Sequence, residues 1–475
     1  MRQPKYIAAL ALLALAACAV GPDYEAPSST LPSDWNEKQS PLDPSTSKIV
    51  PGAVPAVEWW KTFKDAELTS LVERAAIDNL DYKLAQARVR EARGLRGVTA
   101  GALLPSVGAG ANYSRSRFSE NVPLPGAGQQ GNFYQAGFDA AWELDVFGGI
   151  RRSIEAADAS VDASVEARRD VLVTLLAEVA RNYIETRGIQ AQLTIARQNL
   201  DAQKKTLELT QARFQAGRAA ELDVVRAQAQ VSTTGSQIPV LESARIQSAH
   251  RLGVLLGRDP GALRTELQAL SPIPAPPPEV PVGLPSELLR RRPDLRRAER
   301  ELAAATARIG VATAELYPKF SLTGFFALES VTASDFAKWG SRAWSVGPTI
   351  QWSIFQGGRI RAQIEVENAR QEQAAILYEK SILVALQEVE DALVAYAKEQ
   401  AHRAELSDAV AANLKAVDLA NQRYTQGLVD FLSVLDAQRS LYVSQDALVR
   451  SESLISEQLV ALYKALGGGW EMERS

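Results

Sequence analysis

Residue types that could carry out chemistry are sparse in this chain of 475 residues. The two histidines, His250 and His402, lie in helical stretches, where a satisfied surface or core histidine is the simpler interpretation. No phosphate-binding GxxxxGK[ST] motif, nucleophile elbow or metal-spaced Cys/His cluster is present. Carboxylates are numerous, but no pair stands out for acid/base work. The sequence therefore predicts no enzyme, no cofactor and no metal site.

The only cysteine, Cys18, stands where a covalent modification is expected. Arg2 and Lys5 precede the apolar run Ile7–Ala17, and small residues lead up to Cys18, so residues 1–17 are predicted to be a secretory signal peptide. A lone cysteine cannot form an intramolecular disulfide, and acylation would remove its free thiol from an oxidising compartment. The Leu-Ala-Ala-Cys sequence resembles a bacterial lipobox, which implies acyl chains on Cys18 and firm membrane attachment. The alternative is an ordinary signal peptide with an incidental cysteine.

The stretch around Gly427 repeats an earlier stretch around Gly217, which lies 210 residues before it. Glycine tolerates the left-handed backbone that ends a helix, and long apolar-periodic segments run into and out of both glycines. We therefore predict that each glycine marks the tip of a helical hairpin, the alternative being a generic helix-loop-helix. Arg213 and Arg423 each precede their glycine by four residues. They are placed to bond the last carbonyls of their own helices or the side chains of a partner.

The repeat divides the chain into six predicted segments. These are the signal peptide at 1–17, a tether at 18–67, a first repeat at 68–257, a proline-rich linker at 258–285, a second repeat at 286–466 and a tail at 467–475. Each repeat is predicted to hold a helix stopped by proline, two strands and a long helical hairpin. The first helix should run from Leu68 to about Leu104, and its counterpart from Glu287 to Leu316. Apolar residues spaced four and three apart in the long helices predict coiled-coil packing.

Two runs in each repeat alternate between apolar and small or polar residues, which predicts strands. They lie at about 106–118, 132–146, 319–330 and 343–356. Four such strands cannot close on themselves, and open edges cannot lie in lipid because their backbone groups would have no partners. Three chains would supply about twelve strands around a wet lumen. In the alternative, a soluble protein, the aromatic faces would pack on the helices.

Short motifs in a fixed order run along nearly the whole mature chain. They are the lipobox at Cys18 with Gly21-Pro22-Asp23-Tyr24, Arg291-Arg292-Pro293-Asp294, Leu316-Tyr317-Pro318, Phe355-Gln356-Gly357-Gly358, Leu435-Asp436-Ala437-Gln438-Arg439 and Leu466-Gly467-Gly468-Gly469-Trp470. In combination they resemble the outer membrane factor (TolC-like) family, and within it the lipoprotein channels of resistance-nodulation-division efflux systems.

The resemblance implies a mixed α and β fold made mostly of long α-helices. It implies a homotrimer in which a twelve-stranded transmembrane β-barrel is continuous with a periplasmic α-helical coiled-coil barrel, each chain having an internal two-fold structural repeat. The helical tunnel would be about 100 Å long, at 1.5 Å per residue for a helix of roughly 65 residues. An equatorial belt would hold the N-terminal segment, the proline-rich linker and the C-terminus.

Candidate functional residues gather after the second tip. Leu432 and Asp436 are four residues apart on one helix face, and Arg439 lies one turn beyond. Spacing alone favours a solvated intrahelical ion pair between Asp436 and Arg439. The resemblance implies instead that Leu432 and Asp436 form rings closing the periplasmic mouth, with Arg439 restraining the aspartate. It also implies that Asp223 and Tyr424 help hold neighbouring hairpins closed.

The resemblance further implies a passive exit channel for drugs or other small toxic compounds. Its tips, at Gly217 and Gly427 with Arg213 and Arg423, would contact a periplasmic adaptor (membrane fusion) protein. The adaptor would connect the channel to an inner-membrane resistance-nodulation-division pump, and outer-membrane lipid would surround the barrel. Nucleic acid is not an expected partner, because a net charge of −4 offers no basic surface.

Three alternatives to a drug efflux channel stay open. One is the outer-membrane duct of a type I protein secretion system, which shares the fold. Another is a heavy-metal efflux channel, although Met472 is the only methionine of the mature chain and a methionine relay is therefore excluded. The third, from a different class, is a structural coiled-coil lipoprotein that tethers membranes.

Overall fold

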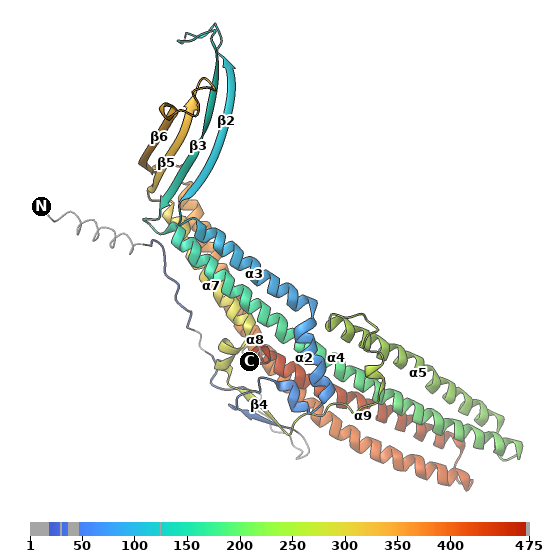
Figure 1. The fold of residues 1–475 in the computed structure, drawn as a ribbon. Coiled ribbons are helices and arrows are strands. Elements are labelled where there is room, and N and C mark those ends of the chain that lie inside the picture. The colour runs from blue at the N-terminus through green and yellow to red at the C-terminus, as the bar shows by residue number, and fades with distance from the viewer. Residues whose placement is uncertain (1–18, 29–30, 37–46, 124, 472–475) are drawn as a thin grey trace. The chain divides into compact units, whose positions relative to one another are not determined.

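The computed structural model describes residues 19–28, 31–36, 47–123 and 125–471. The prediction of a mixed, mostly helical fold is confirmed (Figure 1). Residues group into two compact units. The first unit holds the chain up to Pro27, Arg88–Ser164 and Arg297–Tyr378, and the second holds Ser28–Ala87, Val165–Arg296 and Glu379–Ser475. Within the described residues, no helix combines the length and the apolar character needed to cross a membrane.

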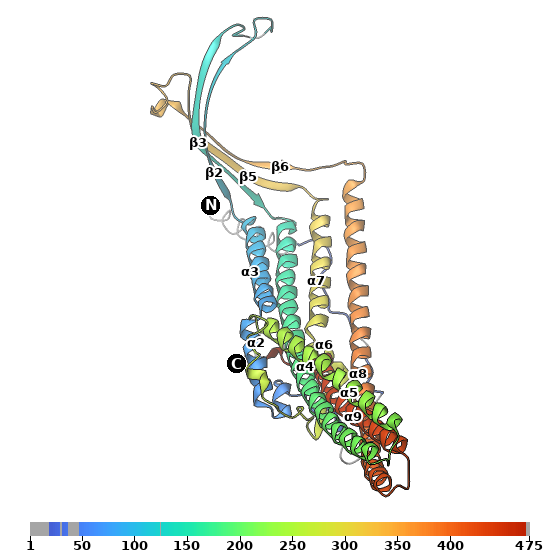
Figure 2. The same ribbon diagram turned by 90° about the vertical axis from the view of Figure 1, so that its right-hand side faces the viewer.

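The strands of the first unit form one antiparallel sheet in the order β2-β3-β5-β6 (Figure 2). They span Ser106–Arg117 (β2), Gln130–Leu144 (β3), Lys319–Ser330 (β5) and Arg342–Gln351 (β6). β2 and β6 each pair on one side only, so both edges of the sheet are open. Large apolar side chains remain exposed along it: Val107, Phe138, Trp344, Val346 and Ile350. Because these side chains are exposed rather than covered, the alternative that the aromatic faces pack on the helices is wrong for this chain.

The last strand is shorter than the sequence predicted. β6 ends at Gln351 instead of near residue 356, because Gln351 already pairs with Lys319, the first residue of β5. Pro318 precedes Lys319 and has no N–H with which to continue the ladder. β3 likewise ends at Leu144, and Asp145 after it turns its carboxylate to the backbone amides of Ile150 and Arg151, at 3.0 and 2.9 Å. The carboxylate thereby caps the following helix.

Helices account for most of the described residues, and four of them are long. α4 (Gly149–Gln215) and α8 (Arg359–Thr425) have 67 residues each, and the returning helices α5 (Glu221–Leu255) and α9 (Phe431–Ala465) have 35 each. In the second unit each long helix and its return form an antiparallel hairpin (Figure 1). The shorter helices α3 (Leu80–Gly101) and α7 (Pro293–Ala314) precede β2 and β5 respectively.

Two helices predicted as continuous are interrupted, so those two predictions are wrong. The first is split into α2 (Ala66–Asp78) and α3 at Asn79, whose ψ of 134° is not helical. The Asn79 side chain donates to the Leu255 carbonyl (2.9 Å) and accepts from the Tyr82 amide (2.8 Å), so it caps the start of α3 and the end of α5. The predicted helix from Glu287 to Leu316 is a short turn η3 (Pro285–Glu287), α6 (Leu288–Arg291) and α7. It breaks at Arg292 because a proline disfavours helical backbone in the residue before it.

The core of the second unit collects segments from both ends of the chain. Trp59, in the turn η1 (Trp59–Phe63), is fully buried and stacks on Tyr463 with ring centroids 5.4 Å apart. Trp470 near the C-terminus donates its indole N–H to the Arg291 carbonyl at 2.8 Å. The N-terminal strand β1 (Lys48–Pro51) pairs in parallel with β4 (Glu279–Gly283), which follows the proline-rich stretch. The N-terminal, linker and C-terminal segments therefore share one core.

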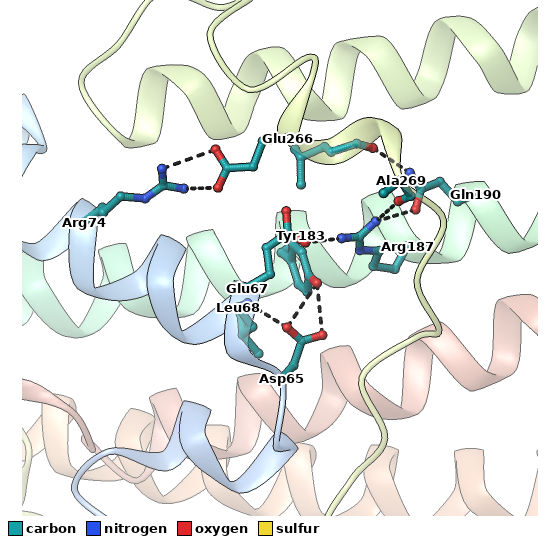
Figure 3. Close-up of polar contacts among 10 residues, drawn as sticks. Asp65, Glu67, Leu68, Arg74, Tyr183, Arg187, Gln190, Glu266 and Ala269 are labelled. Carbon is teal, nitrogen blue, oxygen red and sulfur yellow. Dashed lines mark hydrogen bonds and ion pairs between the residues drawn. The ribbon is translucent and has the colours of Figure 1, made fainter.

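A buried arginine joins the linker to the helices of this unit (Figure 3). Arg187, in α4, has 0% of its side chain exposed. One guanidinium nitrogen donates to Glu67 of α2 at 2.5 Å, and the other donates to the Gln190 side chain (2.8 Å) and the Ala269 carbonyl (2.7 Å). The guanidinium also lies 4.9 Å from the centre of the Tyr183 ring. One side chain thus links α2, α4 and the linker.

Surrounding bonds complete this network. The Tyr183 hydroxyl donates to Asp65 at 3.0 Å, and Asp65 caps α2 by accepting from the Leu68 amide at 2.8 Å. Arg74 pairs with Glu266 at 2.6 Å, in the linker turn η2 (Glu266–Gln268). Burial raises the pKa of Glu67, the Arg187 cation opposes that shift, and the nearby Glu266 and Asp65 carboxylates reinforce it.

We predict that Arg187→Met destabilises the protein by about 3 kcal/mol at neutral pH, because it leaves Glu67 without its cation while keeping the apolar stem. Loss of Arg187 should raise the pKa of Glu67 further above its unfolded value. A carboxyl group with a raised folded pKa contributes stability below its unfolded pKa and loses it as pH rises. The deficit should therefore be smaller at acidic pH in thermal melts of the purified protein.

Arg74→Met is the matched control for this prediction. It removes the partly exposed ion pair that joins Arg74 of α2 to Glu266 of the same linker. Exposed pairs contribute at most about 1 kcal/mol. Equal losses in the two variants at neutral pH would show that the buried pair has no special role.

Candidate functional site

Both hairpin tips end their long helix in the same backbone turn. Gly217 and Gly427 have positive φ values of 68° and 75°. At the second tip the Gly427 amide donates to the Tyr424 carbonyl (3.0 Å) and the Leu428 amide donates to the Arg423 carbonyl (2.9 Å). The first tip has the equivalent pair of bonds, so both are Schellman turns. A Cβ atom added to either glycine would meet no atom within 4 Å, so the glycines are needed for their backbone conformation rather than for space.

The returning helices begin differently. Asp430 caps α9, because its carboxylate accepts from the amide and the hydroxyl of Ser433 at 3.1 and 2.8 Å. These bonds lower the pKa of Asp430. α5 begins after Ala220, which has no side chain able to cap it. The second hairpin therefore has the better-defined start to its return helix.

The two hairpins pack together in an apolar cluster, here called the tip core, drawn from all four helices. Its buried members are Leu207, Ala227, Tyr424, Phe431 and Val434. The rings of Tyr424 and Phe431 lie 5.6 Å apart. The Tyr424 side chain is only 7% exposed, and its hydroxyl has no hydrogen-bond partner among the described residues. Tyr424 thus packs inside the tip of its own chain.

Arg213 forms a polar link between the hairpins. Its guanidinium donates to the Tyr424 carbonyl at 2.9 Å and lies 4.5 Å from the centre of the Tyr424 ring. The sequence predicted that Arg213 would bond its own helix or a partner protein, whereas it caps the end of α8 in the opposite hairpin. The side chain of Arg423 is exposed and bonds to none of the described residues. The two arginines therefore match in sequence but not in role.

The three residues predicted on one face of α9 do lie on its exposed face. Leu432 is 48% exposed, and Asp436 and Arg439 are exposed as well, whereas Phe431 and Val434 point into the tip core. Among the described ion pairs none joins Asp436 to Arg439, so the predicted intrahelical pair is not formed. Asp223 is half-buried in the first turn of α5, where its carboxylate is favoured by the helix dipole. It does not bond the Tyr424 hydroxyl.

Other sequence predictions concern single residues. Cys18 and Met472 lie outside the described residues. Exposed His402 lies 3.2 Å from Glu399, and the described part of the chain contains no cluster of side chains suited to a metal ion.

Sequence reasoning missed Phe431, a main member of the tip core. The sequence could have indicated its role, because Phe431 occupies the position that the charged Glu221 has in the first repeat, and an apolar residue there favours burial.

Comparison with known proteins matches nearly the whole chain. The family described as outer membrane efflux protein matches residues 71–258 and 284–468. The solvent efflux pump outer membrane protein SrpC of Pseudomonas putida is 34% identical over 476 residues, covering 99% of each chain. The outer membrane protein OprJ of Pseudomonas aeruginosa is 32% identical over 482 residues, covering 100% of this chain and 98% of OprJ.

A solved structure agrees with these relatives. The outer-membrane channel OprN is 37% identical, with a TM-score of 0.87, and the match covers 96% of this chain and 100% of that structure. The match therefore spans that structure in full. The chain therefore belongs to the outer membrane efflux protein family.

Proposed function

We propose that this protein is the outer-membrane exit channel of a tripartite efflux pump. It would passively export drugs, solvents or other small toxic compounds across the periplasm and the outer membrane. The observation that carries the proposal is an open-edged sheet with exposed apolar side chains, in a chain that aligns from end to end with efflux pump outer membrane proteins. These relatives favour small-molecule efflux over a type I secretion duct.

The open sheet is the argument for a trimer. Unpaired edges at β2 and β6 could not lie in lipid, because their backbone groups would lack partners. Three chains joined edge to edge would close a barrel of about twelve strands, large enough for a lumen. Equal lengths of α4 and α8, and of α5 and α9, support an internal duplication in which each repeat supplies two strands and one hairpin.

The helical hairpins would then form the periplasmic tunnel, with their tips toward the inner membrane. Open space around Gly217 and Gly427 supports a role for these turns as contact surface for a periplasmic adaptor. Arg423, exposed and unbonded among the described residues, is available to the same partner. The adaptor would join the channel to an inner-membrane resistance-nodulation-division pump, and acylated Cys18 would anchor the protein in the outer membrane.

The exposed face of α9 supplies the proposed gate. Three-fold symmetry would bring three copies of Leu432 and three of Asp436 together. A narrow ring of apolar side chains disfavours water, and a carboxylate ring favours cations and resists anions. Arg439, one turn along, would restrain Asp436. Asp223 and Tyr424 would help to keep the hairpins closed, Tyr424 through its packing with Arg213.

We predict that Cys18→Ser abolishes lipidation but leaves trimer assembly largely intact, because edge pairing and helix packing do not depend on acyl chains. Radiolabelled palmitate should enter the unaltered protein and not the variant. Equal labelling of the two would contradict the modification of Cys18.

We predict that Leu432→Ala combined with Asp436→Ala raises single-channel conductance in a planar bilayer severalfold. The first change widens the proposed leucine ring, and the second removes the negative charge of the proposed aspartate ring. The control is Leu222→Ala, which truncates the matching exposed leucine of the first repeat. If the control raises conductance as much, the constriction lies elsewhere. If neither the unaltered protein nor the double variant conducts, the protein is a membrane tether rather than a channel.

We predict that Gly427→Trp abolishes drug resistance supported by the native adaptor, while Gly427→Ala retains most of it. Both changes strain a backbone with φ of 75°, but only tryptophan adds bulk in the open space around the tip. Resistance assays on cells in which both variants form heat-stable trimers measure the difference. Full resistance in both would remove Gly427 from the docking surface.

A further inference from the structure

The residues that follow Cys18 lie against the first unit. The Val20 amide donates to the Phe147 carbonyl at 3.1 Å, between the end of β3 and the start of α4. Gly21 has a positive φ of 92°, and a Cβ atom there would overlap the Cα atom of Gly310 in α7. The segment 19–24 therefore contacts α7 and the connection between β3 and α4 through its backbone. It includes the Gly-Pro-Asp-Tyr motif, to which neither the gate nor the tips assign a role.

Arg152 of α4 bonds this segment at three points. Its side chain, 6% exposed, donates to the carbonyls of Val20 (3.1 Å) and Gly21 (3.3 Å) and to the carboxylate of Asp23 (2.6 Å). A remaining nitrogen donates to Glu155 of the same helix at 2.8 Å. Release of the segment would break three of the four hydrogen bonds that this guanidinium makes, and hydrogen bonds to a charged group are the more strongly stabilising kind.

Two glycines leave room for the segment. Gly310 lies inside α7, where a Cβ atom would come within 2.9 Å of the Val20 carbonyl and within 2.8 Å of the Arg152 side chain. Gly148 has a φ of 77°, and its Cβ atom would come within 2.7 Å of Ala19. Glycine within a helix is about 1 kcal/mol less favourable than alanine. At Gly310 this loss of helix stability is accompanied by a gain, because the missing side chain leaves the space that the segment occupies.

The far end of the segment is also held. The Tyr24 hydroxyl donates to Glu299 of α7 at 3.0 Å. Its ring packs on an alanine cluster formed by Ala159, Ala303 and Ala304. The guanidinium of Arg300 lies 5.5 Å from the ring centre. Contacts at both ends distinguish a built docking site from a strand of chain that merely passes over the surface.

We propose that Arg152, Gly148 and Gly310 form a docking site for residues 19–24, and that docking fixes the point at which the acylated N-terminus enters the membrane. The proposal rests on the lipidation of Cys18 proposed above. With Ala19 docked, the anchored residue is one Cα–Cα step of about 3.8 Å away. Released as far as Tyr24, the same anchor could wander by roughly 20 Å. The docked segment therefore holds the acyl chains at the junction of β3 and α4.

Hydrogen exchange of the Val20 amide in the purified, lipidated protein tests the docking. Gly310→Ala should accelerate that exchange at least tenfold, because the added methyl group overlaps Arg152 and the Val20 carbonyl, while α7 keeps its protection since alanine favours helix. Arg152→Ala should have the same effect by removing the donors. The matched control is Gly97→Ala in α3, where an added Cβ atom meets nothing within 4 Å and exchange should be unchanged.

Unchanged protection of Val20 in both Gly310→Ala and Arg152→Ala would overturn the docking site. Palmitate labelling of the same samples separates this result from failure of the lipidation proposal. All variants should be labelled as strongly as the unaltered protein, because docking follows modification. A protein that takes up no palmitate would overturn the proposed positioning of acyl chains, whatever the exchange of Val20.

Discussion

The buried guanidinium of Arg187 is the interaction on which the second unit depends. Burying a cation is costly unless it is hydrogen-bonded, and here the two terminal guanidinium nitrogens bond groups from three different segments, while the Nε atom has no partner among the described residues. Moving α2 or the linker out of place would leave a charge buried without partners. The linker, which has little regular structure of its own, therefore gains a defined position against α4. The same unit also contains the paired strands β1 and β4 and Trp470, which bonds the Arg291 carbonyl.

An arginine that bonds a backbone carbonyl recurs at several places where a helix end or an extended segment meets the helices. Arg187 bonds the Ala269 carbonyl of the linker, Arg292 bonds the Ala465 carbonyl at the end of α9, and Arg213 bonds the Tyr424 carbonyl at the end of α8. Arg152 does so for the segment after Cys18. Helix ends and extended segments have carbonyls without intrahelical partners, and the planar, multi-donor guanidinium can satisfy several at once while packing on an aromatic ring. In this chain arginine therefore acts as a connector between segments distant in sequence.

Sequence periodicity predicts helices and strands that bury one continuous face. It does not predict a helix break or a contact that depends on a single side chain. The mostly helical class and the glycine turns follow from pattern and backbone sterics. The break at Asn79 could not be predicted, because it depends on bonding to Leu255, a residue far along the chain. The break at Arg292 could have been predicted from Pro293. The role of Arg213 could not, since two aligned arginines have the same sequence context and only one finds the opposite hairpin within reach.

The asymmetry between the tips bears on how the proposed gate opens. The gate residues lie on α9, whose start is fixed by the Asp430 cap and by Phe431 in the tip core. The polar links from the first hairpin to this assembly include a hydrogen bond of 2.8 Å from the Gln438 side chain of α9 to the Thr206 hydroxyl of α4. They also include one charged hydrogen bond and one cation–π contact from Arg213. The two Arg213 contacts together contribute about 2 to 4 kcal/mol. A partner that binds with micromolar affinity supplies about 8 kcal/mol. Under this proposal, adaptor binding that favours separated hairpins by part of that energy would break the Arg213 link, and the proposed gate would need no covalent energy source within the channel itself.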